Sequence, residues 1–251
     1  MKNGIDVSHW QGNINWEQVK KAGIHFAIIK AGGSDAGFYT DSKFATNYAS
    51  AKGVSIKVGA YYFVGKGCKS YADGAADAQR FLNIIKGKQF EYPVYIDFEA
   101  PDASNKSGNT QACIGFCKHM EQHGYYCGIY SSDISGFVDR LNMNELTPYT
   151  WWVARYGSEP KRARQNLHIW QKSSTGRVAG INGNVDLNES YVDFEDIIVP
   201  KGMNGFPKKD TVIIRDTTSN PTPQQPKTIE QRLAELEQRV GVLEAKSVGL
   251  L

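Results

Sequence analysis

Residues 94–99 read Val94-Tyr95-Ile96-Asp97-Phe98-Glu99. Apart from its two acids, the run is β-branched or aromatic, which is typical of a buried strand. The segment 110–122 that follows has a helical pattern and ends before Gly124, and residues 125–130 have a strand-like pattern again. A strand, a helix and a second strand in this order predict one β–α–β unit with parallel strands.

The same alternation continues on both sides of this unit. Further strands are expected at 5–7, 25–30, 54–64, 151–156, 167–172 and 184–187, and further helices at 16–22, 41–52 and 71–86. Little helix separates the last three strands. Eight strands whose helices fade toward the end predict an α/β fold, an irregular (β/α) TIM-like barrel, over residues 1–199.

Acids at strand ends are the main candidates for chemistry, because barrel active sites lie at the carboxyl ends of the strands. Asp97 and Glu99 are two residues apart and therefore point to the same face of a strand, with Cα atoms ~6.5–7 Å apart. Carboxyl groups this close cannot both ionise easily, so one pKa rises. A protonated acid beside an ionised one is what glycoside hydrolysis requires. Asp6 and Asp186 end two further expected strands.

Two other interpretations of the acid pair stay open. Asp97 and Glu99 could simply pair with lysine or arginine, although two acids inside an apolar strand are costly without a function. They could also bind a metal, which the lack of a histidine on a matching strand disfavours. Cys113 and Cys117 are one helical turn apart, but no second pair follows at zinc-like spacing. We expect buried free thiols, no metal and no cofactor.

Aromatic side chains near the expected strand ends fit a sugar substrate, because their flat apolar faces suit the C–H face of a pyranose. The residues near these ends are Trp10, Tyr61, Tyr62, Tyr130, Trp151, Trp152, Tyr156 and Trp170. Roughly half of them should line a cleft, since amphipathic rings tolerate partial exposure. The expected substrate-binding residues are Trp10, Tyr62, Tyr130, Trp152, Tyr156 and Trp170.

Seven short motifs add a family resemblance. They are Gly4-Ile5-Asp6-Val7-Ser8-x-x-Gln11-Gly12, Asn15-Trp16, Gly59-Ala60-Tyr61-Tyr62-Phe63, Asp97-Phe98-Glu99, Trp152-Val153-Ala154-Arg155-Tyr156, Trp170-Gln171 and Val185-Asp186-Leu187-Asn188. In this order and over residues 1–199, the chain resembles the glycoside hydrolase family 25 lysozymes, the Chalaropsis-type muramidases common among bacteriophage endolysins. The resemblance implies an irregular β/α barrel that cleaves the β-1,4 bond between N-acetylmuramic acid and N-acetylglucosamine in bacterial peptidoglycan.

The resemblance also implies roles for the acids. Glu99 would be the general acid, and Asp97 would act either as nucleophile or by orienting the 2-acetamido group of the substrate. Asp6 and Asp186 would complete the acidic floor of the cleft. The family often has histidine where Tyr62 stands, which is a departure at that position.

Two alternatives compete with a muramidase. Chitinase-type enzymes carry further aspartates two and five residues before the position of Asp97, where this chain has Tyr95 and Tyr92. From a different class, the protein could be a catalytically inactive wall-binding or phage structural protein. The presence of all four acids counts against that, because binding alone would not need them.

The C-terminal part has a different composition. Residues 200–227 contain Pro221, Pro223 and Pro226 and are expected to be a linker, with one short strand at 211–215. Residues 228–247 are expected to form an amphipathic helix whose apolar seam consists of Ile229, Leu233, Leu236, Val240 and Leu243. We expect a coiled coil that makes a homo-oligomer, with docking of a single helix onto the barrel as the alternative.

Composition limits the other partners and the location. The 251 residues carry a net charge of +3, which is too small to indicate a nucleic-acid partner. No run approaches the roughly 18 apolar residues of a membrane span, so no membrane insertion is expected. The N-terminus lacks the pattern of a signal peptide. We therefore expect a protein made in the host cytoplasm that acts on the cell wall after release.

Overall fold

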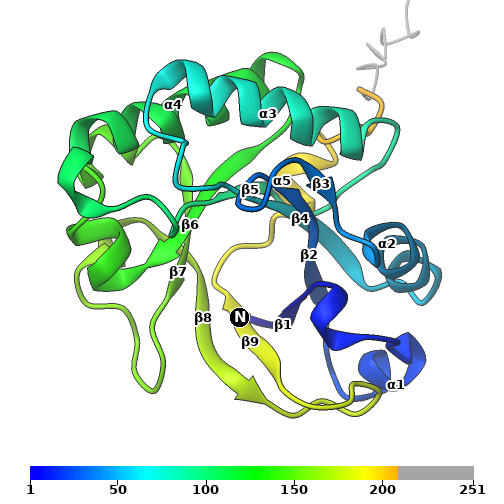
Figure 1. Cartoon of the computed structure of the whole chain (residues 1–251). Helices are drawn as coiled ribbons and strands as arrows, with labels where there is room; N and C mark the ends of the chain where they lie inside the picture. Colours follow the sequence, from blue (N-terminus) through cyan, green and yellow to red (C-terminus); the bar gives the residue numbers. More distant parts are fainter. Residues whose placement is uncertain (209–251) are drawn as a thin grey trace, which may run out of the picture. The chain divides into compact units, whose positions relative to one another are not determined.

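The computed structural model describes residues 1–208 of the chain (Figure 1). The strand expected at 211–215 and the helix expected at 228–247 lie outside the described residues. Among the helices of residues 1–208, none combines the length and the apolarity that crossing a bilayer requires.

Within residues 1–208, eight strands close into a barrel, because β1 pairs with β2 on one side and with β9 on the other. The barrel strands are β1 (Lys2–Val7), β2 (Phe26–Gly33), β4 (Lys57–Phe63), β5 (Val94–Asp97), β6 (Cys127–Ser132), β7 (Thr150–Ala154), β8 (Leu167–Gly176) and β9 (Val185–Ser190). A two-residue strand, β3 (Tyr39–Thr40), pairs antiparallel with the end of β2. The expected mixed α/β class with a closed barrel is confirmed.

The direction of the last strand differs from the expectation. β9 runs antiparallel to both β8 and β1, whereas the pairs from β1–β2 through β7–β8 are parallel. Residues 177–184 join β8 to β9, and a connection this short cannot make the crossover that a parallel pair needs, ~12 residues or more. The parallel pairing that the repeated β–α units predict therefore does not extend to β9.

A helix follows each of the barrel strands β1, β2, β4 and β5 in the chain and packs outside the barrel. They are α1 (Trp16–Lys21), α2 (Phe44–Gly53), α3 (Tyr71–Ile85) and α4 (Lys106–Gln122), with the single turn α5 (Glu195–Ile198) near the end. Helices α3 and α4 lie side by side (Figure 1). A Cβ on Gly74 would lie 1.9 Å from the carbonyl oxygen of Ala112, and one on Gly115 would lie 2.1 Å from that of Tyr71. Only glycine allows the two backbones to come this close.

The alternation of side chains along the strands divides the apolar residues into an inner and an outer layer. Tyr61 and Tyr95 are paired positions on β4 and β5 and pack inside the barrel with Trp152. Their neighbours Tyr62 and Ile96 belong to the outer layer, beneath the helices. This parity means that Asp97, two residues after Tyr95, also points inward.

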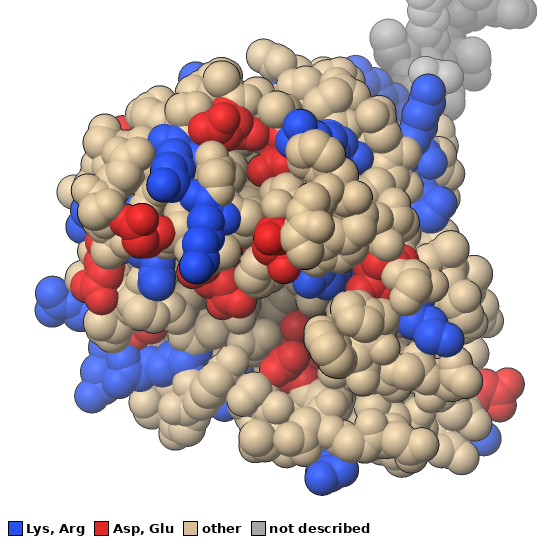
Figure 2. Space-filling view, viewed as in Figure 1, with Lys and Arg blue, Asp and Glu red and all other residues tan. Residues whose placement is uncertain are grey.

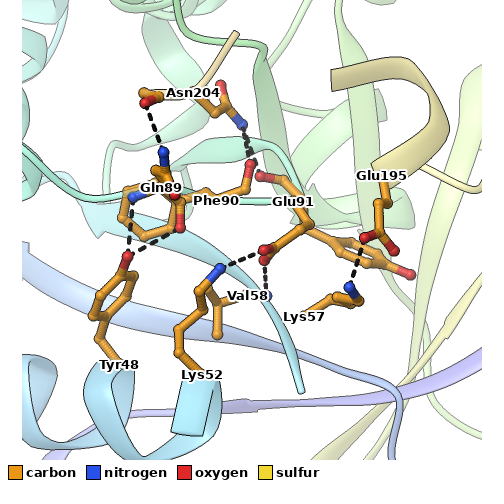
Figure 3. Close-up of polar contacts among 11 residues, drawn as sticks. Tyr48, Lys52, Lys57, Val58, Gln89, Phe90, Glu91, Glu195 and Asn204 are labelled. Atoms are coloured by element: carbon orange, nitrogen blue, oxygen red, sulfur yellow. Dashed lines mark hydrogen bonds and ion pairs between the residues drawn. The ribbon is translucent and has the colours of Figure 1, made fainter. Parts of the chain in front are cut away.

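Asn204 binds the segments that lead into two neighbouring barrel strands, and Figure 3 shows it beside residues 89–91. It is fully buried, and its Nδ2 donates to the carbonyl oxygens of Phe90 and Tyr92 at 3.1 and 2.9 Å, while its Oδ1 accepts from the amide of Tyr126 at 2.6 Å. These partners precede β5 and β6. The compact unit therefore includes the described residues 200–208, beyond the boundary expected at residue 199.

Replacing Asn204 with alanine is expected to lower the free energy of unfolding by about 2–4 kcal/mol, because two buried carbonyls and one buried amide lose their partners. Urea denaturation measures this change. Asn83→Ala, which removes an exposed amide that accepts a hydrogen bond from Gln79, is the matched control and should cost less than ~0.5 kcal/mol. Equal stability of the two variants would contradict the structural role of Asn204.

Candidate active site

The first acid pair lies where β5 ends. Asp97 is the last residue of β5, and its side chain points into the barrel and is 5% exposed. Ile96 and Phe98 pack in the outer layer, so the inward direction of Asp97 follows from the alternation of the strand. Glu99 lies two residues further on and is open to solvent. Within residues 1–208, the buried Oδ1 of Asp97 has no hydrogen-bond partner, which calls for a functional explanation.

The second acid pair joins the two ends of the sheet. Asp6 on β1 and Asp186 on β9 are directly opposite each other in the antiparallel pair. Asp6 is buried, and its Oδ2 accepts hydrogen bonds from Gln171 Nε2 at 2.9 Å and from Asn188 Nδ2 at 2.8 Å. Asp186 is half-buried. The charge of Asp6 acts on Asp97 and that of Asp186 on Glu99, so the four acids share one site.

Burial dominates the electrostatics of this site. It raises the pKa of Asp97 well above its usual range, and the neighbouring Glu99 carboxylate adds to the effect. Burial, followed by the charge of Asp186, raises the pKa of Asp6 well above its usual range. Although Glu99 is open on one side, the surrounding protein excludes water from the rest, and this desolvation raises the pKa of its carboxyl. An acid that keeps its proton toward neutral pH can donate it to a leaving group.

A chain of hydrogen bonds fixes the floor of the site. Tyr130 and Tyr156 donate from their hydroxyls to Gln171 Oε1, at 2.9 and 3.2 Å, and Gln171 in turn donates to Asp6. On the other side of Asp6, Trp152 Nε1 donates to Asn188 Oδ1 at 2.7 Å. Each amide therefore has a defined orientation, which fixes the position of the Asp6 carboxylate.

Figure 2 shows a hollow near the centre of the viewed face with acidic side chains around it. Of the expected substrate-binding residues, Trp10 is 79% exposed and Tyr156 is 55% exposed. Tyr130 lies in the inner layer with its hydroxyl on Gln171. Trp10 and Tyr156 therefore have positions that a bound sugar could reach, whereas Tyr130 is 7% exposed and supports Gln171 from inside the barrel.

Three other expected sugar contacts do not hold. Tyr62 is 1% exposed and packs in the outer layer against Phe81 and Phe116 beneath the helices, on the opposite side of β4 from the acids. Ile169 and Gln171, on either side of Trp170, face the inside of the barrel, so Trp170 points outward. Its Nε1 donates to the carbonyl of Arg155. Trp152 faces inward but is fully buried against Tyr130, so it supports the site without reaching its surface.

The structure adds residues that the sequence analysis did not select. Tyr61 points inward near the acids, where burial and then the charges of Asp6 and Asp97 raise its pKa well above its usual range. Lys30 of β2 is buried beside the same site. The sequence did contain a signal for Lys30. It is the single charged residue in the strand Phe26–Gly33, just as Asp97 is the single charged residue in Val94–Asp97.

Within residues 1–208, no group of three or more His, Cys, Asp or Glu side chains is arranged to hold a metal ion. The four cysteines are free and buried, as expected.

Comparison with known proteins gives consistent matches. The family model described as glycosyl hydrolases family 25 matches residues 5–181. Lysozyme M1 of Streptomyces globisporus is 33% identical over 207 residues, a match that covers 74% of this chain and 66% of that protein. The autolytic lysozyme of Clostridium acetobutylicum is 27% identical over 186 residues, covering 74% of this chain and 55% of the relative. The matches thus span less than two thirds of the length of these two relatives.

A solved structure agrees with these sequence matches. The crystal structure of the CTP1L endolysin superposes with a TM-score of 0.68 at 27% identity, over 79% of this chain and 69% of that one.

Proposed function

The chain belongs to the glycosyl hydrolases of family 25, and from this premise we propose that it hydrolyses the β-1,4 bond between N-acetylmuramic acid and N-acetylglucosamine in bacterial peptidoglycan. The observation that carries the proposal is the pair Asp97 and Glu99 at the carboxyl end of β5, beside the second pair Asp6 and Asp186. The names of Lysozyme M1 and of the autolytic lysozyme support the same activity.

In the proposed reaction, Glu99 gives its proton to the glycosidic oxygen as the bond to the muramic acid carbon breaks. Its raised pKa and its open side suit this role. Asp97 then supports the positive charge at that carbon, either by attacking it directly or by orienting the 2-acetamido oxygen that attacks. Glu99, now ionised, takes a proton from the water that completes hydrolysis.

The other polar and aromatic residues bind and orient the substrate in this proposal. Asp6 and Asp186 form the acidic floor, held by Gln171 and Asn188. Trp10 and Tyr156 contact the glycan, and Tyr130 holds Gln171 in place. The Ser8 side chain accepts from the Trp10 amide at 3.2 Å, so the exposed ring stands on a capped turn that holds it in place.

Mass spectrometry of digested peptidoglycan tests this function. A muramidase leaves new reducing ends on N-acetylmuramic acid, whereas a glucosaminidase leaves them on N-acetylglucosamine. The absence of any new reducing ends, with binding to the wall retained, would support the alternative of a catalytically inactive wall-binding protein.

We further propose that the protein is a phage or prophage endolysin whose catalytic unit is an irregular TIM-like barrel. Similarity to the CTP1L endolysin supports the cellular role, and the helices α1 to α4 outside the first parallel strands support the architecture. Residues 200–227 would then act as a linker. The helix proposed at 228–247 would join copies of the chain through its apolar seam.

Deletion of residues 228–251 should lower the mass measured by light scattering to that of one chain, because the proposed contact between copies is removed. The full chain is expected to have at least twice that mass. An unchanged mass after deletion would contradict self-association through this segment.

A further inference from the structure

Lys30 is a buried cation beside the catalytic acids. It lies on β2 and is 9% exposed. Its Nζ lies 4.7 Å from the centre of the Phe63 ring, 5.5 Å from that of Tyr39 and 6.0 Å from that of Tyr61. The faces of aromatic rings attract a cation, but by only ~0.5–2 kcal/mol per contact, so the rings alone do not explain why a lysine is buried here.

Lys30 has no conventional partner. Within residues 1–208, its ammonium makes no ion pair with a carboxylate and no hydrogen bond. Lysine is almost never buried unless it is paired. Its charge must therefore be stabilised by acids that it does not touch, and Asp97 and Glu99 are the acids on which it acts.

The register of the sheet places Lys30 in the same inner layer as the acid pair. Lys30 is paired with Tyr61 across β2 and β4, and Phe63 on β4 is paired with Asp97 on β5. The ammonium therefore lies over the ring of Phe63, and Phe63 is paired with Asp97 on the neighbouring strand. A charge of opposite sign close to a carboxylate in a water-poor site favours the ionised form.

On this geometry, and on the proposed function, we propose that Lys30 is a positioning residue whose ammonium sets the charge state of the Asp97–Glu99 pair. With this charge in place, one of the two carboxyls is ionised while the other holds the proton that the reaction needs.

The other charges around Asp97 and Glu99 act on the pKa of one acid or the other. Asp6 and Asp35 act on Asp97 and raise its pKa, whereas Lys30 lowers it against the larger effect of burial. Around Glu99, Asp186 raises the pKa, and Arg140 and Lys30 lower it. Lys30 thus acts on both acids, whereas Arg140 acts on Glu99. The hydroxyls of Tyr61 and Tyr130 also face the acids, but burial raises their pKa well above its usual range, so they stay neutral.

The variant Lys30→Met tests the proposal, because it keeps the apolar stem and removes the charge. Without the ammonium the pKa of both carboxyls should rise, so both limbs of the pH–kcat profile should move to higher pH by about one unit. Turnover on the acidic limb should fall roughly tenfold and recover at higher pH, with little change in KM. Lys30→Arg should keep the wild-type profile.

Lys118→Met is the matched control, because it removes the same charge from an exposed residue of α4. Its profile should match that of the wild type. A lower kcat for Lys30→Met at every pH with unmoved limbs would mean a merely structural role. A raised KM with unmoved limbs would mean that Lys30 contacts the substrate. Either result would overturn the proposal.

A readout independent of activity keeps this test separate from that of the proposed function. In protein labelled with ¹³C at the carboxyl carbons of Asp and Glu, the Asp97 and Glu99 signals should titrate at higher pH in Lys30→Met than in the wild type. Unshifted titrations would overturn the role of Lys30. If the wild type produces no new reducing ends from peptidoglycan, the proposed function fails, while the titrations still decide the role of Lys30.

Discussion

Replacing Glu99 with glutamine is expected to slow peptidoglycan hydrolysis by ~10²–10⁴-fold while leaving the fold intact. Glutamine has the same shape as the protonated acid but cannot give a proton to the glycosidic oxygen. Within residues 1–208, no hydrogen bond or ion pair engages the Glu99 side chain, so the substitution removes no structural contact. Clearance of a wall suspension, followed over time, measures the rate.

Two comparisons make the Glu99 result specific. Glu145→Gln changes the same charge at an exposed surface position and should leave the rate unchanged. Asp6→Asn and Asp186→Asn should slow turnover less than Glu99→Gln, because they alter the floor of the cleft and leave the proton donor in place. Near wild-type clearance by Glu99→Gln would remove Glu99 from the role of acid, and a larger loss in either aspartate variant would mean that the roles are assigned wrongly.

Most of the barrel could be predicted because its signals are local. Strand β5 (Val94–Asp97) falls within the expected 94–99, because the run is continuously apolar up to its acid. Helix α3 (Tyr71–Ile85) matches the expected 71–86, because its apolar residues have a helical period and Gly87 follows it. The direction of β9 could not be predicted. Residues 185–190 show a strand pattern whichever way the chain runs, and their direction follows from the short connection to β8 and from the closure against β1.

The acids of the site could be predicted because a charge inside an apolar strand is rare and costly. The same argument applies to Lys30, although we did not apply it there. Tyr61 and Tyr62 show the limit of local reasoning, since adjacent residues point to opposite faces and only the register with β5 identifies Tyr61 as the inward one. Gln171 and Asn188 stand in two of the quoted motifs, but their hydrogen bonds to Asp6, which is distant in sequence from both, could not be read from a local pattern.

Replacing Asp97 with asparagine should abolish most activity and also make the protein more stable at neutral pH. Either proposed route needs the negative charge of Asp97 beside the sugar carbon, so the rate should fall by at least ~10²-fold. In the folded protein, the Asp97 side chain is buried, its Oδ1 has no hydrogen-bond partner within residues 1–208, and the acids Glu99 and Asp6 lie nearby. Keeping a charge there costs stability, and the neutral amide should recover ~1 kcal/mol or more.

The pH dependence of that gain follows from the sign of the pKa shift. Burial raises the pKa of Asp97 in the folded state above its unfolded value, so ionisation is harder in the folded protein. At a pH below the unfolded value, the carboxyl is neutral in both states and costs nothing. As the pH rises through the interval between the unfolded and the folded pKa, the wild type loses stability. The difference between Asp97→Asn and wild type should therefore grow with pH in that interval and then stay constant.

Asp133 is the matched control with the opposite sign. It is also a buried aspartate, and burial alone would raise its pKa, but the amides of Lys161, Arg162 and Ala163 and the guanidinium of Arg155 bring it below its usual value. Asp133→Asn should therefore destabilise the protein at neutral pH by about 1–3 kcal/mol, and the loss should shrink as the pH falls through the lowered pKa. Thermal unfolding of the three proteins between acidic and neutral pH measures both trends. We expect a buried acid that the fold binds with donors to stabilise the protein and one left without donors to destabilise it. Equal destabilisation by both variants would contradict that distinction.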